Sequence, residues 1–206
     1  MADGQVHEWT NQLIERLGAH GFRPISADLG DEGEVAGARR ADFRVMWALT
    51  KLHTFVLVHE VDVATAEHVR RLSQRSTAYA IRSKGGLPLG LQTGVAVLPI
   101  LVCRSAEDEA VEFAEHRPPK RFAALTLPML VELSQQRFVT YHEPRFWGAY
   151  YQDFLGEQQR LIAGELNGQV LPPGGERRAN RWLLASVGSV VAAIVVPLVL
   201  HVAGVI

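Results

Sequence analysis

The spacing of apolar residues predicts that helices and strands alternate over most of the chain. From Val6 to Leu17 they recur every three or four positions, which is typical of an amphipathic helix, and Gly21 predicts its end. The segment 28–37 is rich in glycine and acidic residues and predicts a loop. From Ala41 to Leu49 the period changes to two, which predicts a strand that pairs as a hairpin with a second, β-branched strand over 53–61.

The same reasoning extends to the second half of the chain. A helical pattern over 65–83 ends at the glycine pair 85–86, and the apolar run 95–103 predicts a central strand covered on both faces. A short acidic helix over 108–116, a hairpin formed by 127–133 and 137–142, and a helix over 145–166 follow. This order predicts one α/β domain over residues 1–170, with a mixed sheet flanked by helices.

The last 25 residues, 182–206, contain no Asp, Glu, Lys or Arg. A helix of this length reaches roughly 37 Å, which exceeds a hydrocarbon core of about 30 Å, so the segment predicts one C-terminal transmembrane helix that acts as a tail anchor. Residues 171–181 form a linker rich in Pro, Gly and Arg. Because Arg177, Arg178 and Arg181 precede the span and no charge follows it, we expect a single-pass protein of the cell membrane with a cytoplasmic N-terminal domain.

Small residues in the predicted span suggest a way for two copies to associate. They recur at a spacing that lets two helices approach closely, so a homodimer or another membrane protein is a possible partner. These residues are Ala185, Ser189, Ala192 and Ala193.

Composition narrows the classes of partner. Residues 1–175 carry 18 basic and 21 acidic side chains, a mildly acidic balance that argues against broad affinity for nucleic acid. The single cysteine, Cys103, lies in an apolar run and is expected to be a buried thiol in a reducing compartment. A basic helix face over 70–84 fits either a solvated surface or contact with phosphate, anionic lipid or an acidic partner.

Three acidic residues carry the one candidate for chemistry. Asp42 lies on the first predicted hairpin strand, and Glu60 and Asp62 end the second. This arrangement, with the order of elements over Val6–Cys103, about half the chain, resembles the restriction-endonuclease-like fold of the PD-(D/E)xK nucleases. In that family an Asp on one strand and an Asp or Glu on the next bind a divalent cation, and a Lys follows two residues later. Here Asp62 stands in the place of that Lys, and Ala41 in that of the proline.

Three functions remain open from the sequence, one of which is a subunit of a larger membrane assembly with an exposed apolar patch on the domain. The leading interpretation is a non-catalytic interaction or regulatory module, displayed on the membrane and needing no cofactor. In that case Asp42 and Glu60 are solvated strand residues, with Arg40 or Arg44 as partners, and Asp62 caps the following helix. The alternative is a membrane-tethered nuclease or phosphodiesterase in which Asp42, Glu60 and Asp62 bind Mg²⁺.

Overall fold

The computed structural model describes residues 2–43, 51–86, 89, 93–116, 124–141, 152–164 and 166–168. The chain divides into two units, Met1–Leu171 and Pro172–Ile206, and every described residue belongs to the first. Its elements in chain order are α1 (Ala2–Ala19), β1 (Arg23–Asp28), a 3-10 turn η1 (Gly30–Glu32), β2 (Glu34–Phe43), β3 (Lys51–Ala64), α2 (Ala66–Ser83), β4 (Thr93–Ala106), α3 (Asp108–Glu115), β5 (Ala124–Thr126), β6 (Met129–Glu132), β7 (Arg137–Thr140), α4 (Gln152–Ala163) and β8 (Asn167–Gly168).

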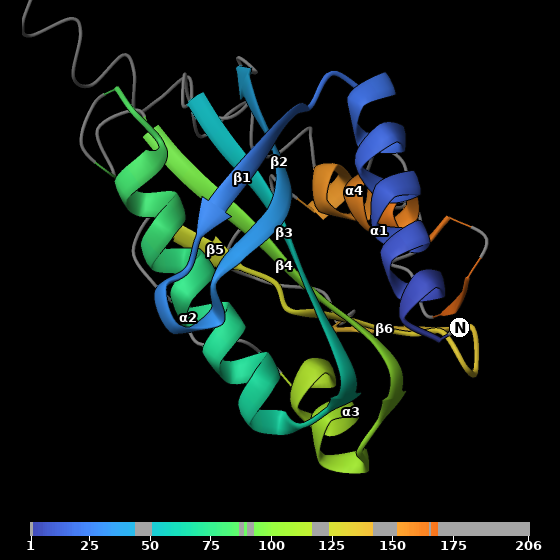
Figure 1. Cartoon of the computed structure of the whole chain (residues 1–206). Helices are drawn as coiled ribbons and strands as arrows, with labels where there is room; N and C mark the ends of the chain where they lie inside the picture. Colours follow the sequence, from blue (N-terminus) through green and yellow to red (C-terminus); the bar gives the residue numbers. More distant parts are fainter. Residues whose placement is uncertain are drawn as a thin grey trace, which may run out of the picture. The chain divides into compact units, whose positions relative to one another are not determined.

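The strands form one mixed sheet in the order β1-β2-β3-β4-β6-β7-β8, with β5 also paired to β4 (Figure 1). The strands β1, β2 and β3 make an antiparallel meander. Helix α2 then carries the chain across one face of the sheet, so that β4 lies parallel to β3. The strands β6 and β7 form an antiparallel hairpin beside β4. The predicted α/β domain with a mixed sheet is therefore confirmed.

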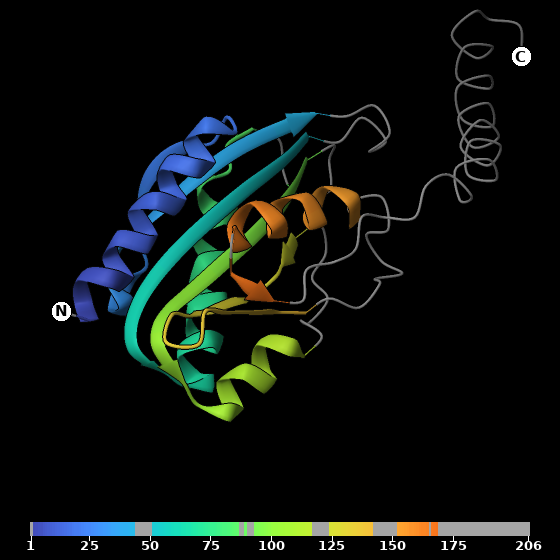
Figure 2. The same ribbon diagram turned by 90° about the vertical axis from the view of Figure 1, so that its right-hand side faces the viewer.

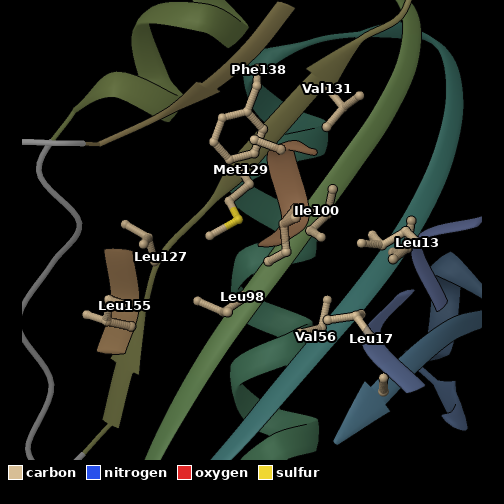
Figure 3. Close-up of a cluster of buried hydrophobic side chains, with 14 of the residues drawn as sticks. Leu13, Leu17, Val56, Leu98, Ile100, Leu127, Met129, Val131, Phe138 and Leu155 are labelled. Carbon is tan, nitrogen blue, oxygen red and sulfur yellow. The ribbon is translucent and has the colours of Figure 1, made fainter. Parts of the chain in front are cut away.

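Helices cover both faces of this sheet (Figures 1 and 2). Apolar side chains of α1 and α4 pack on one face, against strand residues such as Val56 and Ile100, and Figure 3 shows part of this cluster. Side chains of α2 and α3 pack on the other face, against residues such as Leu57 and Leu101. Successive residues of a strand point to opposite faces, which is why even-numbered positions of β3 and β4 meet α1 and α4.

Local sequence signals determine where α1 ends and where α2 begins. At the end of α1 the Phe22 N–H donates to the Leu17 carbonyl at 3.1 Å and the Gly21 N–H to the Gly18 carbonyl at 3.0 Å. This is a Schellman motif, in which Gly21 takes the left-handed conformation (φ 80°) that glycine adopts without strain. At the start of α2 Thr65 is the N-cap: its hydroxyl accepts from the backbone of His68, and the His68 ring accepts from the Thr65 backbone.

The central strand β4 holds a proline, Pro99, in a nearly fully buried run. The Val97 carbonyl accepts from the Leu127 N–H at 2.9 Å, so odd-numbered residues of β4 direct their backbone groups toward β5 and β6. The backbone nitrogen of Pro99, which is also odd-numbered, points the same way. It faces the break between β5, which pairs with Val95–Val97, and β6, which pairs with Ile100–Cys103, so that no ladder donor is missed there.

The predicted loop over 28–37 is wrong in its second half. Glycines do form the turn, where Gly30 and Gly33 take positive φ, but β2 already begins at Glu34. Gly37 belongs to the strand because a Cβ at this position would lie 2.6 Å from both the Val56 carbonyl oxygen and the Leu57 side chain. Glycine here permits close strand approach rather than a turn.

Other predicted elements agree in part. The hairpin of β2 and β3 is confirmed, with Phe43 opposite Lys51, but of the predicted strand 41–49 only 41–43 are described. The short strands β1, β5 and β8 were not predicted. Residues 142–151 and the linker and tail, 171–206, lie outside the described residues. Within the described ranges no helix is long and apolar enough to cross a membrane.

Candidate functional site

Asp42, the first predicted metal ligand, is engaged by an arginine of its own strand. The Arg40 Nε donates to the Asp42 Oδ2 at 2.9 Å, and both side chains are 20% exposed. Arg40 also donates to the His20 carbonyl at 2.7 Å, and its guanidinium lies 4.5 Å from the Phe22 ring centroid. The carboxylate therefore orients an arginine that fastens β2 to the end of α1, and Arg40 is one of the two partners named above for Asp42.

Glu60 and Asp62 lie far from Asp42 along the sheet. The residue opposite Asp42 on β3 is Leu52, and Glu60 comes eight residues later on the same strand. At about 3.3 Å per residue this separates the two acids by roughly 26 Å, far beyond the span of one cation's ligands. Glu60 instead faces His7 of α1, with 3.5 Å between Oε1 and Nδ1.

Asp62 does not cap the following helix, and that expectation is wrong. The cap is Thr65, and the Asp62 carboxylate accepts from Arg104 of β4 at 2.9 Å in an exposed ion pair. Among the described residues no three His, Cys, Asp or Glu side chains converge in a way that could hold a metal ion. The structure thus separates Asp42 from Glu60 and Asp62, which are neighbours on β3, and each of the three carboxylates faces a different side chain.

Glu32, a carboxylate that the sequence did not single out, lies between two basic side chains. Its side chain is 9% exposed and lies 3.3 Å from the His59 Nε2 and 3.4 Å from the Arg71 Nη1. Burial is the main cause that lowers the pKa of His59, with the nearby His68 also lowering it and Glu32 opposing. His59 is therefore expected to be neutral at pH 7, and this contact ties the turn η1 to β3 and α2.

The predicted basic face of α2 is neutralised over its first half by acids of the same chain. Arg70 pairs with Glu67, and Arg71 pairs with both Glu67 and Glu32. Arg75 pairs with Asp31 of η1 at 2.7 Å. An external phosphate would therefore have to displace a carboxylate from each of these three arginines. This half of the face fits the solvated, structural interpretation.

Among the described residues the most buried acid is Glu132, which ends β6. Its side chain is 2% exposed, and Arg137 of β7 donates to it through Nε at 3.0 Å and Nη2 at 2.7 Å. The other carboxylate oxygen accepts from the Ala106 N–H at 3.3 Å, which joins the end of β4 to the hairpin. Burial, and then the charge of Glu132, raises the pKa of the adjacent Cys103 thiol to about 12, so this thiol is no nucleophile at neutral pH.

One group of basic side chains could not be seen from the sequence. Burial lowers the pKa of His53, and the positive charges of Lys51, Lys84 and Arg39 lower it further. These residues come from β2, β3 and the end of α2, so only the strand register brings them together. A cross-strand pairing of Arg23 with Arg39 adds a further cation beside them.

Comparisons with known proteins give no assignment: no family model matches the chain, and neither a curated protein nor a solved structure matches it.

Proposed function

We propose that the chain is a tail-anchored, single-pass membrane protein whose N-terminal α/β domain is a non-catalytic interaction or regulatory module. The observation that carries the membrane part is the charge-free run 182–206, preceded by Arg177, Arg178 and Arg181. The likeness to the PD-(D/E)xK fold stays a prediction from the order of elements, and the proposal does not depend on it.

The contacts of the acidic residues support the non-catalytic part. Asp42 is held by Arg40, and Glu60 lies near His7. The distance between Asp42 and Glu60 along the sheet prevents the two acids from sharing one cation. Asp62 faces Arg104 instead of completing a cluster. A metal-dependent nuclease needs these carboxylates to converge on the scissile phosphate, so their arrangement favours a role in fastening elements of the fold.

Topology is the property that tests the tether. We expect protease added to inverted membrane vesicles to digest the N-terminal domain of the full chain, and protease added to right-side-out vesicles to leave it intact. Digestion from the outer side alone, or from both sides equally, would contradict the predicted cytoplasmic placement.

A cation titration tests the non-catalytic part. Mg²⁺ or Mn²⁺ added to the full chain in detergent is expected to leave its thermal midpoint unchanged, because an ion stabilises a protein only when it binds the folded state preferentially. A rise in the midpoint that disappears in an Asp42→Asn, Glu60→Gln variant would support the nuclease alternative instead.

A further inference from the structure

One end of the sheet carries cations on the same face as α2, beside and beyond the C-terminal end of that helix. Arg39 and Arg23 lie on the α2 side, because each is four residues from a side chain of the α2-side core, Val35 and Ala27 respectively. Lys51 lies on the same face of β3, and α2 covers this strand only as far as Phe55, which packs against Ala80. Arg23, Arg39 and Lys51 are all exposed.

These three cations have no carboxylate partner within the described part of the chain. This separates them from Arg70, Arg71 and Arg75 at the other end of the same face, which form ion pairs with acids of η1 and α2. The pairing of β1 with β2 places Arg23 directly opposite Arg39, an arrangement of like charges that costs stability in an isolated sheet. In the sequence, the segments 44–50 and 87–92, which follow β2 and precede β4, contain no Asp or Glu.

An exposed aromatic side chain accompanies the cations. Phe43 is 58% exposed, the most exposed large hydrophobic residue among those described, and it lies directly opposite Lys51. It occupies the face of β2 that Arg39 occupies, four residues further along the strand. Cations beside a protruding ring form the chemistry of a membrane-surface contact, in which the cations approach lipid phosphates and the ring enters the interface.

We propose that this surface, the basic sheet end (Arg23, Arg39, Lys51, Lys84 and Phe43), docks the domain on the phosphate groups of anionic lipid headgroups. The inference deepens the proposed function and rests on it, since a membrane tail raises the local concentration of the domain at the bilayer. Docking would fix which face of the α/β domain is turned away from the lipid and remains available to a partner.

Lipid fits the basic sheet end better than nucleic acid does. The basic sheet end is small, and residues 1–175 carry more acidic than basic side chains. An extended polyanion would therefore be repelled by the acidic surface outside the basic sheet end. A planar anionic surface needs only a small cluster of cations at one end of the domain. Each cation near such a surface contributes about a fivefold change in the ratio of docked to undocked domain, so three contribute about a hundredfold.

The test uses a fluorescent label at one introduced thiol. The native Cys103 is fully buried with a pKa raised to about 12, so an environment-sensitive dye will react selectively with the thiol of an Ala41→Cys variant. Ala41 is exposed on β2 between Arg39 and Phe43. The control label is placed by Gln135→Cys in the exposed turn between β6 and β7, at the opposite end of the sheet.

Each labelled full chain is reconstituted into vesicles of phosphatidylcholine alone or of phosphatidylcholine with phosphatidylglycerol. We expect the dye at position 41, and not that at 135, to shift to the blue and to be quenched by spin-labelled lipid only when anionic lipid is present. High salt should weaken the response, because the cations act through the headgroup charge.

Two triple variants of equal net charge decide whether the response belongs to the basic sheet end. Arg23→Gln, Arg39→Gln, Lys51→Gln should abolish it, with a thermal midpoint no lower than that of the parent because like charges have been removed. The matched control, neutralised at the three α2 arginines whose ion pairs are described, should keep the response. Its substitutions are Arg70→Gln, Arg71→Gln and Arg75→Gln.

Three outcomes would overturn the proposal: no response of the dye at 41 on anionic vesicles, an equal loss in both triple variants, or a response to added RNA but not to vesicles. Flotation of the same samples after a high-salt wash reports tail insertion separately. A chain that fails to float refutes the proposed tether, while the dye still shows whether the basic sheet end binds the vesicle surface.

Discussion

The ion pair between Glu132 and Arg137 gives the sharpest test of how the sheet is held together. In an Arg137→Gln variant the carboxylate of Glu132, 2% exposed, would lose both guanidinium contacts and keep only the Ala106 N–H at 3.3 Å. Breaking a fully buried pair costs about 3–5 kcal/mol. Because the Arg137 side chain is 36% exposed and water screens it in part, we expect a loss of about 2–4 kcal/mol.

The assay is urea unfolding of the full chain in detergent, followed by circular dichroism. Arg104→Gln is the matched control, since Arg104 pairs with Asp62 in an exposed contact on the neighbouring strand β4 and should cost less than about 1 kcal/mol. The double variant Glu132→Gln, Arg137→Gln should lose less than Arg137→Gln alone, because no unpaired charge is then left buried.

Equal losses in Arg137→Gln and Arg104→Gln would refute the reasoning, as would a double variant whose loss is the simple sum of the two single losses. Either result would mean that burial of the Glu132 carboxylate does not set the free energy of unfolding in this part of the sheet.

Three further predictions follow from single positions. Gly37→Ala should lower the free energy of unfolding by about 1–3 kcal/mol, because its Cβ would lie 2.6 Å from the Val56 carbonyl, whereas Gly4→Ala, with nothing within 4 Å, should not; equal effects in urea unfolding would contradict this. Since the pKa of His59 is lowered in the folded protein, the unfolded chain binds more protons as the pH falls below about 6.5, and stability should fall with it. Thermal midpoints measured against pH check this, and His59→Gln should reduce the slope; an unchanged slope would refute the role of His59. Cys103, with a pKa raised to about 12, should react with a disulfide reagent at pH 8 only after unfolding, and rapid reaction of the native chain would contradict its burial.

Periodicity in the sequence was enough to predict the elements that bury a continuous apolar stripe. The helix ended by Gly21, the helix α2 and the strand β4 were predicted because each combines an apolar pattern with a cap, glycine or loop signal. The strand β1 escaped prediction because it is short and mostly exposed: Arg23, Pro24 and Ser26 are exposed, and Ala27 alone is buried. It is a strand because β2 offers it an edge, and that is a tertiary effect.

The candidate metal site failed to assemble for a reason of register. The sequence shows that Asp42 and Glu60 lie on consecutive strands, but it does not show at which height the strands pair. The hairpin places Leu52 opposite Asp42, so the two acids fall at different heights of the sheet. The same register gathers Arg23, Arg39 and Lys51, three cations separated along the sequence, and no local motif could have indicated that cluster.

Membrane integration of the full chain tests the central claim of a tethered module most directly. The measurement is flotation with membranes after an alkaline wash, for the parent chain and for an Ile194→Asp, Val195→Asp variant. Each aspartate at the centre of a span costs about 2.5–3.5 kcal/mol, so the account predicts that the parent floats and the variant is released. A Gly174→Asp, Gly175→Asp control in the linker should float like the parent. Release of the parent chain, or flotation of the Ile194→Asp, Val195→Asp variant, would contradict the tether.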